Sequence, residues 1–270
     1  YARTAAQIKA DFKARGTTKG TSASLGASSQ NLSALSDGLV GYWKMDEASW
    51  NNNCVATSVT DSSGNANNGS ACPATTGPTG GAVGKFGNGG FFDGVDDYVD
   101  FGDPSSLKGF SSYSMGFWVN QGTTTTGERD IIHKDLVYQI VIDGGTLKAA
   151  NGTQWAFQTG PTITQGVWTH ILVTWDGDLL KIFKNGSLTN TFDLTNGSVP
   201  SNTNNLSFGR NTSGSSFFHG SLDDIRIYNR ALSPAEVAQL YAWAPGPVGY
   251  WNFEEGSGLS AKDSSGNGNA

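Results

Sequence analysis

The sequence contains few of the residues that build most catalytic and metal centres. Its 270 residues include five glutamates, three histidines and two cysteines. The histidines, at 133, 170 and 219, are widely separated, and the cysteines lack the spacing of a zinc site. The Gly-x-Ser-x-Gly motif of nucleophilic hydrolases is also absent. These absences argue against an enzyme.

Two further absences narrow the possible partners. The formal net charge is -6, and no basic stripe interleaved with aromatic residues is present, so the sequence does not predict a nucleic-acid-binding protein. No apolar run is long enough to span a bilayer, so we expect no membrane insertion of this segment.

Aromatic residues and glycine are abundant instead. The chain has 8 Trp, 8 Tyr, 14 Phe and 37 Gly, a composition typical of short strands that bury an aromatic core and are joined by polar turns. The pattern predicts an all-β fold, a two-sheet antiparallel jelly-roll sandwich with short terminal helices. Strands are expected within 39–49, 90–101, 113–119, 131–134, 137–142, 155–157, 167–175, 179–184, 205–209 and 222–228.

Cys54 and Cys72 flank a loop that contains Asp-Ser-Ser-Gly-Asn at 61–65. A disulfide between them would contribute roughly 3 kcal/mol on the chain-entropy model. It would also indicate an oxidising compartment, hence an exported protein at the cell surface or outside the cell. Two unpaired thiols are the alternative. The loop residues suit either a tight turn or a hard cation such as calcium.

Internal repeats suggest that the chain is a slice through a tandem array. The segment LVGYWKMDEAS at 39–49 returns as PVGYWNFEEGSG at 247–258, and Asp-Ser-Ser-Gly-Asn recurs from Asp263. A helix pattern at 4–14 recurs at 233–241 with a capping box. The predicted organisation is a helix ending a preceding repeat at 1–15, a Gly/Ser/Thr linker at 16–38, a complete domain at 39–242, a linker at 243–246 and an incomplete repeat at 247–270.

Five motifs occur in the order expected for one family. They are GLVGYWKMDE, DSSGNANNG, FFDGVDDYV, GVWTHILVTWDGDLLKIFKNG and GSLDDIRIYNRALSPAEVAQLY. Over about 39–241 the chain resembles the laminin-G-like members of the concanavalin A-like lectin/glucanase superfamily. The resemblance implies a jelly roll of two curved sheets, found in tandem in large exported bacterial proteins. It also implies that His170 is a hydrogen-bonded core residue.

The resemblance further implies one structural calcium where the start and the end of the domain meet. One side of the site would come from the early loop, and a carboxylate of the last strand would complete it. The alternative for that last carboxylate pair is ordinary charge at a strand edge. The residues carried over as metal ligands are Asp61, Gly64, Asn68, Asp93 (the weakest), and Asp223 or Asp224.

The superfamily also contains glucanases with a Glu-x-Asp-x-x-Glu strand, which this sequence lacks. A retaining glycosidase needs two carboxyls about 5–5.5 Å apart, and no strand pattern here supplies an alternating acidic pair. Sugar binding would instead need exposed aromatic rings. Trp155 and Phe217 lie in loop-rich surroundings and are the candidates, although most aromatic residues are more simply explained as core.

Two functions follow as hypotheses. The first is a non-catalytic extracellular module of a tandem array, which serves adhesion or the assembly of a surface fibre or filament and has neighbouring copies of itself as partners. The second is a lectin-like module that binds carbohydrate and targets polysaccharide.

Overall fold

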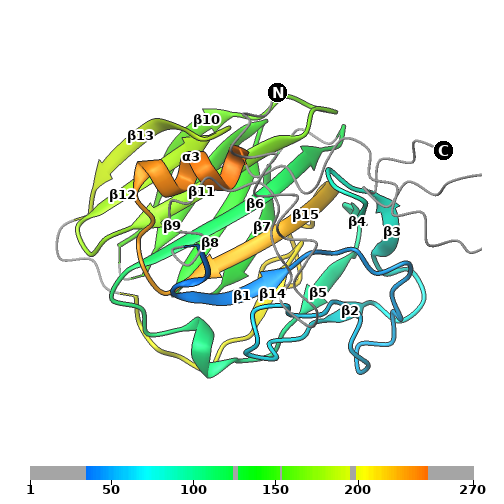
Figure 1. Ribbon diagram of the computed structural model, residues 1–270. Helices are drawn as coiled ribbons and strands as arrows, with labels where there is room; N and C mark the ends of the chain where they lie inside the picture. Colours follow the sequence, from blue (N-terminus) through cyan, green and yellow to red (C-terminus); the bar gives the residue numbers. More distant parts are fainter. Residues whose placement is uncertain (1–34, 124–126, 153, 195–198, 243–270) are drawn as a thin grey trace, which may run out of the picture. The chain divides into compact units, whose positions relative to one another are not determined.

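The computed structural model describes residues 35–123, 127–152, 154–194 and 199–242 (Figure 1). The helix expected at 4–14 and the incomplete repeat at 247–270 lie outside the described residues, as does nearly all of the linker at 16–38. The chain divides into two compact units, and Gly38–Tyr241 is the one that the structure describes almost completely.

The described strands form two antiparallel sheets, which confirms the predicted jelly-roll sandwich. The first has the order β13-β12-β11-β6-β15-β4-β3, with β1 also paired to β15. The second has the order β10-β9-β8-β7-β14-β5-β2. The first sheet consists of β1 (Leu39–Trp43), β3 (Thr79–Val83), β4 (Asn88–Asp93), β6 (Tyr113–Gln121), β11 (Thr169–Trp175), β12 (Leu179–Lys184), β13 (Ser187–Asp193) and β15 (His219–Tyr228). The second consists of β2 (Ser70–Cys72), β5 (Tyr98–Asp100), β7 (Glu128–Lys134), β8 (Tyr138–Asp143), β9 (Thr146–Asn151), β10 (Gln154–Thr162) and β14 (Leu206–Phe208).

The core lies between the sheets and is built by strand alternation. Met115, Phe117 and Val119 of β6 are fully buried, as their spacing of two predicts. Trp43 of the first sheet packs against Phe101 with ring centroids 4.9 Å apart. The same side chain meets Phe208 of the second sheet edge-on at 5.1 Å. Trp43 therefore joins the two sheets next to the early loop.

Strand β15 lies inside the first sheet although it is the last strand of the domain. One of its edges pairs with β6, whereas β4 and β1 share the other edge (Figure 1). The register shifts where the partner changes from β4 to β1, and Asp224 at this bulge has a φ of 55°. The Asp223-Asp224 pair thus marks the point where β15 changes partner.

Helix α3 (Pro234–Ala242) follows β15 and begins with the predicted capping box. Glu236 Oε2 accepts hydrogen bonds from the backbone N–H and the hydroxyl of Ser233, both at 2.8 Å. At its other end Tyr241 stacks on Trp118 of β6 at 5.7 Å. Within the described residues no helix is long and apolar enough to cross a membrane.

His170 of β11 is buried, as expected, but it lies against α3 and not in the core between the sheets, and its neighbours are aromatic. Its ring lies 5.2 Å from that of Trp118 and 5.9 Å from that of Tyr241. Its Nδ1 has no hydrogen-bond partner among the described residues. Burial, together with the nearby Arg226 guanidinium, lowers the pKa of His170 to about 3, so this imidazole is neutral at neutral pH.

Candidate functional site

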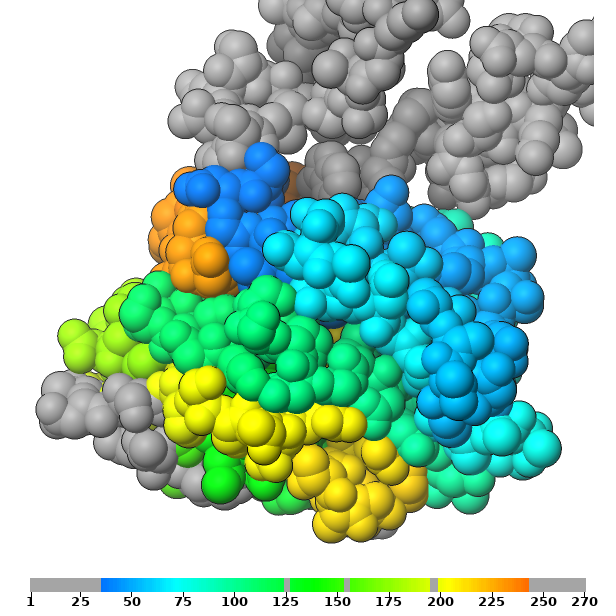
Figure 2. Space-filling view, turned by 90° about the horizontal axis from the view of Figure 1, so that it is seen from below, coloured from blue at the N-terminus to red at the C-terminus, as the bar shows by residue number. Residues whose placement is uncertain are grey.

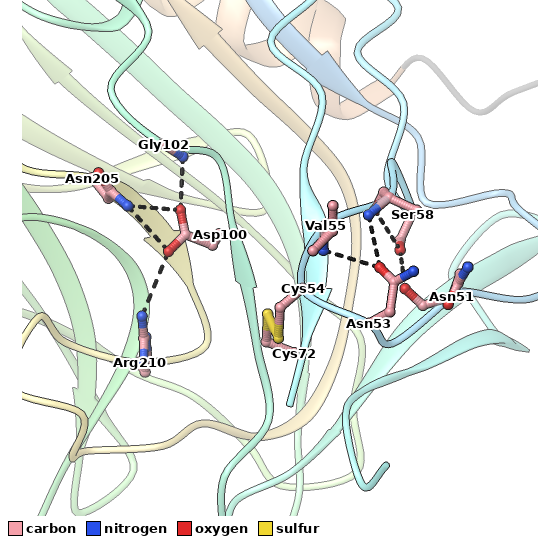
Figure 3. The surroundings of a disulfide bond; sticks show 11 residues. Asn51, Asn53, Cys54, Val55, Ser58, Cys72, Asp100, Gly102, Asn205 and Arg210 are labelled. Atoms are coloured by element: carbon pink, nitrogen blue, oxygen red, sulfur yellow. Dashed lines mark hydrogen bonds and ion pairs between the residues drawn. A yellow bond between two sulfur atoms is a disulfide. The ribbon is translucent and has the colours of Figure 1, made fainter. Parts of the chain in front are cut away.

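A disulfide ties the early loop to the second sheet. Cys54 and Cys72 are bonded with their Cα atoms 5.0 Å apart, as the sequence predicted (Figure 3). Beside Cys54, the Asn53 side-chain oxygen accepts hydrogen bonds from the backbone N–H groups of Val55 at 3.0 Å and Ala56 at 2.7 Å. Because Cys72 ends β2, the base of the loop is fixed covalently to a strand.

Asp61 organises the rest of the loop. Its Oδ1 accepts hydrogen bonds from the backbone N–H groups of Tyr42 (2.9 Å) and Ser63 (2.8 Å). Its Oδ2 accepts the backbone N–H of Asn67 (2.9 Å) and the Ser63 hydroxyl (2.8 Å). A carboxylate has about four lone-pair positions, so these four donors use all of them. The residue is 8% exposed, and its side chain holds the loop against β1.

A second anchor is the backbone carbonyl of Val40 in β1. It accepts hydrogen bonds from the Asn67 side-chain amide at 2.7 Å and from the Asn65 amide at 3.2 Å. The indole N–H of Trp43 donates to the Asn67 carbonyl at 2.8 Å. These hydrogen bonds hold the loop against β1.

The outer side of this loop forms one wall of an open hollow of about 480 Å³. The other wall is the segment around the 3₁₀ helix η1 (Ser105–Leu107). In Figure 2 the cyan part of the chain, which includes the loop, lies against the green part, which includes η1. The lining is mostly polar and consists of Asn65, Ala66, Asn67, Asn68, Phe101, Asp103, Pro104, Ser105 and Ser106.

Amides and hydroxyls dominate the hydrogen-bonding groups of the hollow. The side chains of Asn65 and Asn68 are exposed, and Ser105 is exposed beside them. Asn68 accepts the backbone N–H of Asp61 at 2.9 Å through its Oδ1, which fixes the side chain and leaves its Nδ2 as a donor. The Ser106 hydroxyl donates to Asn67 Oδ1 at 2.9 Å, so the two walls are linked.

Asp103 is the one carboxylate in the lining, and it is already paired. Lys108 donates to its Oδ2, and Lys134 donates to its Oδ1 at 2.8 Å. These hydrogen bonds hold the pKa of Asp103 below its ordinary value. Glycoside hydrolysis needs two carboxyl groups, one of them able to carry a proton. The lining supplies one carboxyl group, and that group is held in its charged form by two lysines.

The last-strand carboxylates predicted as metal ligands have other partners. Asp223 is almost fully buried, and its Oδ2 accepts the backbone N–H of Phe86 at 2.8 Å. Burial raises the pKa of Asp223 to about 8, and the Asp224 and Asp46 carboxylates add to the rise. Asp224 accepts a hydrogen bond from Arg226 at 2.8 Å.

The predicted calcium ligand set is not assembled in the structure. All four lone-pair positions of Asp61 are used, and Asp224 is ion-paired. Among the described residues, the one group of three or more acidic side chains close enough to hold a metal ion contains Asp93 but neither Asp61 nor the last-strand pair. These residues do not fit a single calcium shared by the loop and the last strand. Calcium itself stays a prediction.

The remaining candidates are dispersed. Gly64 occupies an exposed turn with a φ of 94°, which explains the glycine there. Asp93 ends β4, where it meets Asp96 and Asp97. Phe217 is partly exposed in the connection before β15 and does not line the hollow. Trp155 belongs to β10, but its side chain is not among those that the structure describes.

Sequence reasoning missed the second wall of the hollow. Ser105 and Ser106 belong to a Gly-Asp-Pro-Ser-Ser run, which has the composition of a turn. That run carries no sign that it lies opposite a loop about 40 residues earlier.

Comparison with known proteins identifies the family. A family model named for laminin G, and described as the concanavalin A-like lectin/glucanases superfamily, matches residues 93–238, more than half of the chain. The chain belongs to this superfamily. No match is found among curated protein sequences.

Solved structures of similar fold include a domain solved with a trisaccharide and the binding domains of toxins. Domain 4 of AbnA, an extracellular arabinanase from Geobacillus stearothermophilus, solved with arabinotriose, has a TM-score of 0.59 and 22% identity; the match covers 75% of this chain and 98% of that domain. The binding domain of Paraclostridial Mosquitocidal Protein 1 gives 0.60 and 17%, with coverages of 77% and 52%. The botulinum neurotoxin serotype G binding domain gives 0.58 and 16%, with coverages of 76% and 50%. The chain thus spans about half the length of the two toxin domains.

Proposed function

We propose that this domain is a non-catalytic extracellular module of lectin type, and that the hollow between Asn65–Asn68 and η1 binds a neutral oligosaccharide. The observation that carries the proposal is the prearranged wall of asparagine amides. Sugar hydroxyls act as both donors and acceptors. In this wall the Asn67 amide is used by Val40 and Ser106, whereas Asn68 Nδ2 is left as a donor and Asn65 Oδ1 as an acceptor.

Rigidity favours binding at this place. Asp61 and the Val40 carbonyl hold the loop through hydrogen bonds, and the disulfide closes its base. A ligand that docks against a fixed wall does not have to order it, so less of the interaction energy is lost to conformational entropy. Asp103 is neutralised by two lysines, which favours an uncharged ligand over a cationic one.

The family relationship supports the same reading. The arabinanase domain of similar fold was solved with a trisaccharide, and the toxin domains of similar fold are named for binding. The disulfide supports a location outside the cell. The adhesion and array hypothesis, with neighbouring copies as partners, depends on repeats outside the described residues. It becomes the better account if no glycan binds.

The experiment is a glycan array with the full chain, followed by titration calorimetry of the best oligosaccharide. Ser105→Tyr places a ring in the hollow and is expected to weaken binding at least tenfold. Ser187→Tyr is the matched control, because Ser187 is also exposed but begins β13 and is not a lining residue. It is expected to bind like the parent.

Trp155→Ala tests the site predicted from sequence. If this variant abolishes binding while Ser105→Tyr leaves it unchanged, the hollow is not the site. If no glycan on the array binds the parent chain, the carbohydrate proposal is wrong.

A further inference from the structure

Three carboxylates converge at the turn between β4 and β5. Asp93 is the last residue of β4, and Asp97 immediately precedes β5. The turn between them brings three carboxylates together. One oxygen from each of Asp93, Asp96 and Asp97 lies within 4.8 Å of the other two. This is the one group of its kind among the described residues.

Two oxygens of this cluster are buried without a hydrogen-bond donor. Asp97 is 2% exposed; its Oδ2 accepts the backbone N–H of Asp93 at 2.7 Å, whereas its Oδ1 has no partner. Asp96 accepts the Thr76 hydroxyl at 3.0 Å through Oδ2, and its Oδ1 is likewise without a partner. Buried carboxylate oxygens without donors are costly, so this pair is stabilised by either a proton or a bound cation.

The nearby cations are engaged elsewhere. Among the described residues no lysine or arginine forms an ion pair with these three carboxylates. The guanidinium of Arg210 stacks on Tyr98, the residue after Asp97, at 3.4 Å from the ring centroid and pairs with Asp100. His219 faces Asp93 across the β4–β15 ladder, and its ring packs edge-on against Phe91.

The electrostatics agree with an uncompensated cluster. Burial, with smaller contributions from the neighbouring Asp93 and Asp96 carboxylates, raises the pKa of Asp97 to about 7. A proton can relieve the repulsion, and so can a divalent ion.

We propose that Asp93, Asp96 and Asp97 hold a hard divalent cation of the calcium class. Calcium takes six to eight oxygen ligands, preferably carboxylates, carbonyls and water, and the exposed Asp93 side leaves room for water. This ligand set shares only Asp93 with the set that the family resemblance implies. Because β4 belongs to the first sheet and β5 to the second, the ion ties the two sheets together at this corner.

The test is titration calorimetry of the chelator-treated full chain with CaCl₂. The expected Kd is on the order of 10⁻⁴ to 10⁻³ M, the range of extracellular calcium modules. Asp97→Asn and Asp96→Asn are each expected to weaken calcium binding at least tenfold. Asp178→Asn is the control, because it removes an exposed carboxylate from another β-turn and is expected to change nothing. Asp223→Asn tests the other acidic site.

Three results would overturn the proposal. The first is no heat of binding up to several millimolar calcium. The second is binding that survives in both Asp97→Asn and Asp96→Asn. The third is binding that only Asp223→Asn removes, which would place the ion at the last strand. If Asp97→Asn does not fold by near-UV circular dichroism, the half-exposed Asp96 decides the outcome alone.

Discussion

The two acidic turns of this domain use the same residue types for opposite purposes. In the 61–67 turn, four hydrogen-bond donors surround one carboxylate, and three of them are backbone N–H groups. In the 93–97 turn, three carboxylates meet and two of their oxygens have no donor. The first turn is complete without a ligand, and the second is not. The number of hydrogen-bond donors around the carboxylates distinguishes these two turns, whereas their amino-acid composition does not.

Removing the central carboxylate of the first turn is the strongest test of this contrast. Asp61→Ala leaves the backbone N–H groups of Tyr42, Ser63 and Asn67 without their acceptor, and we expect a loss of about 4 kcal/mol in the free energy of unfolding. Urea unfolding in calcium-free buffer measures it. Ser62→Ala, an exposed neighbour, is the control. A loss below about 1 kcal/mol, no larger than a single ordinary hydrogen bond is worth, would mean that Asp61 does not organise the turn.

The disulfide adds a covalent constraint to the first turn only. Replacing both Cys54 and Cys72 with alanine is expected to cost about 3 kcal/mol, because the unfolded chain regains the entropy of an open loop. Oxidised and reduced parent protein should differ by a similar amount. Calcium affinity at the 93–97 turn should remain within twofold. A large loss of calcium affinity would show that the two turns are coupled.

His170 also makes the free energy of unfolding depend on pH in the acid range. The two turns can be compared there only after this contribution has been removed. The pKa of His170 is lowered from 6.5 in the unfolded chain to about 3 in the folded protein, so the unfolded chain binds more protons between these values. This contribution to stability is complete above pH 6.5 and is lost at about 1.4 kcal/mol per unit as the pH falls toward 3. His170→Phe should flatten that slope in urea titrations. An unchanged slope would show that protons bind elsewhere.

The central strands were predictable because both packing and alternation mark them. Met115, Phe117 and Val119 of β6 define their strand in the sequence alone. Strands β2, β3 and β13 were not predicted, and all three lie at sheet edges. An edge strand such as β13, with its largely exposed SLTNTFD, buries little and needs no apolar alternation. β9 was also missed, because TLKAAN has few strand-forming residues.

The candidate sites show a different limit of prediction from sequence. Composition identified the Asp-Ser-Ser-Gly-Asn loop as important, but it could not show that the backbone of Tyr42 and the carbonyl of Val40 complete it. Those groups are common to every residue and become specific only when β1 is placed beside the loop. The same holds for Ser106, whose contact with Asn67 joins segments 39 residues apart.

The place of β15 has a consequence for the timing of synthesis. This strand lies between β6 on one edge and β4 and β1 on the other, so until the ribosome has released residues 219–228 the first sheet exists as separate pieces. The edges of β6, β4 and β1 stay unpaired during that interval and can pair with other chains. We therefore expect the nascent domain to be most prone to aggregation until β15 has emerged from the ribosome.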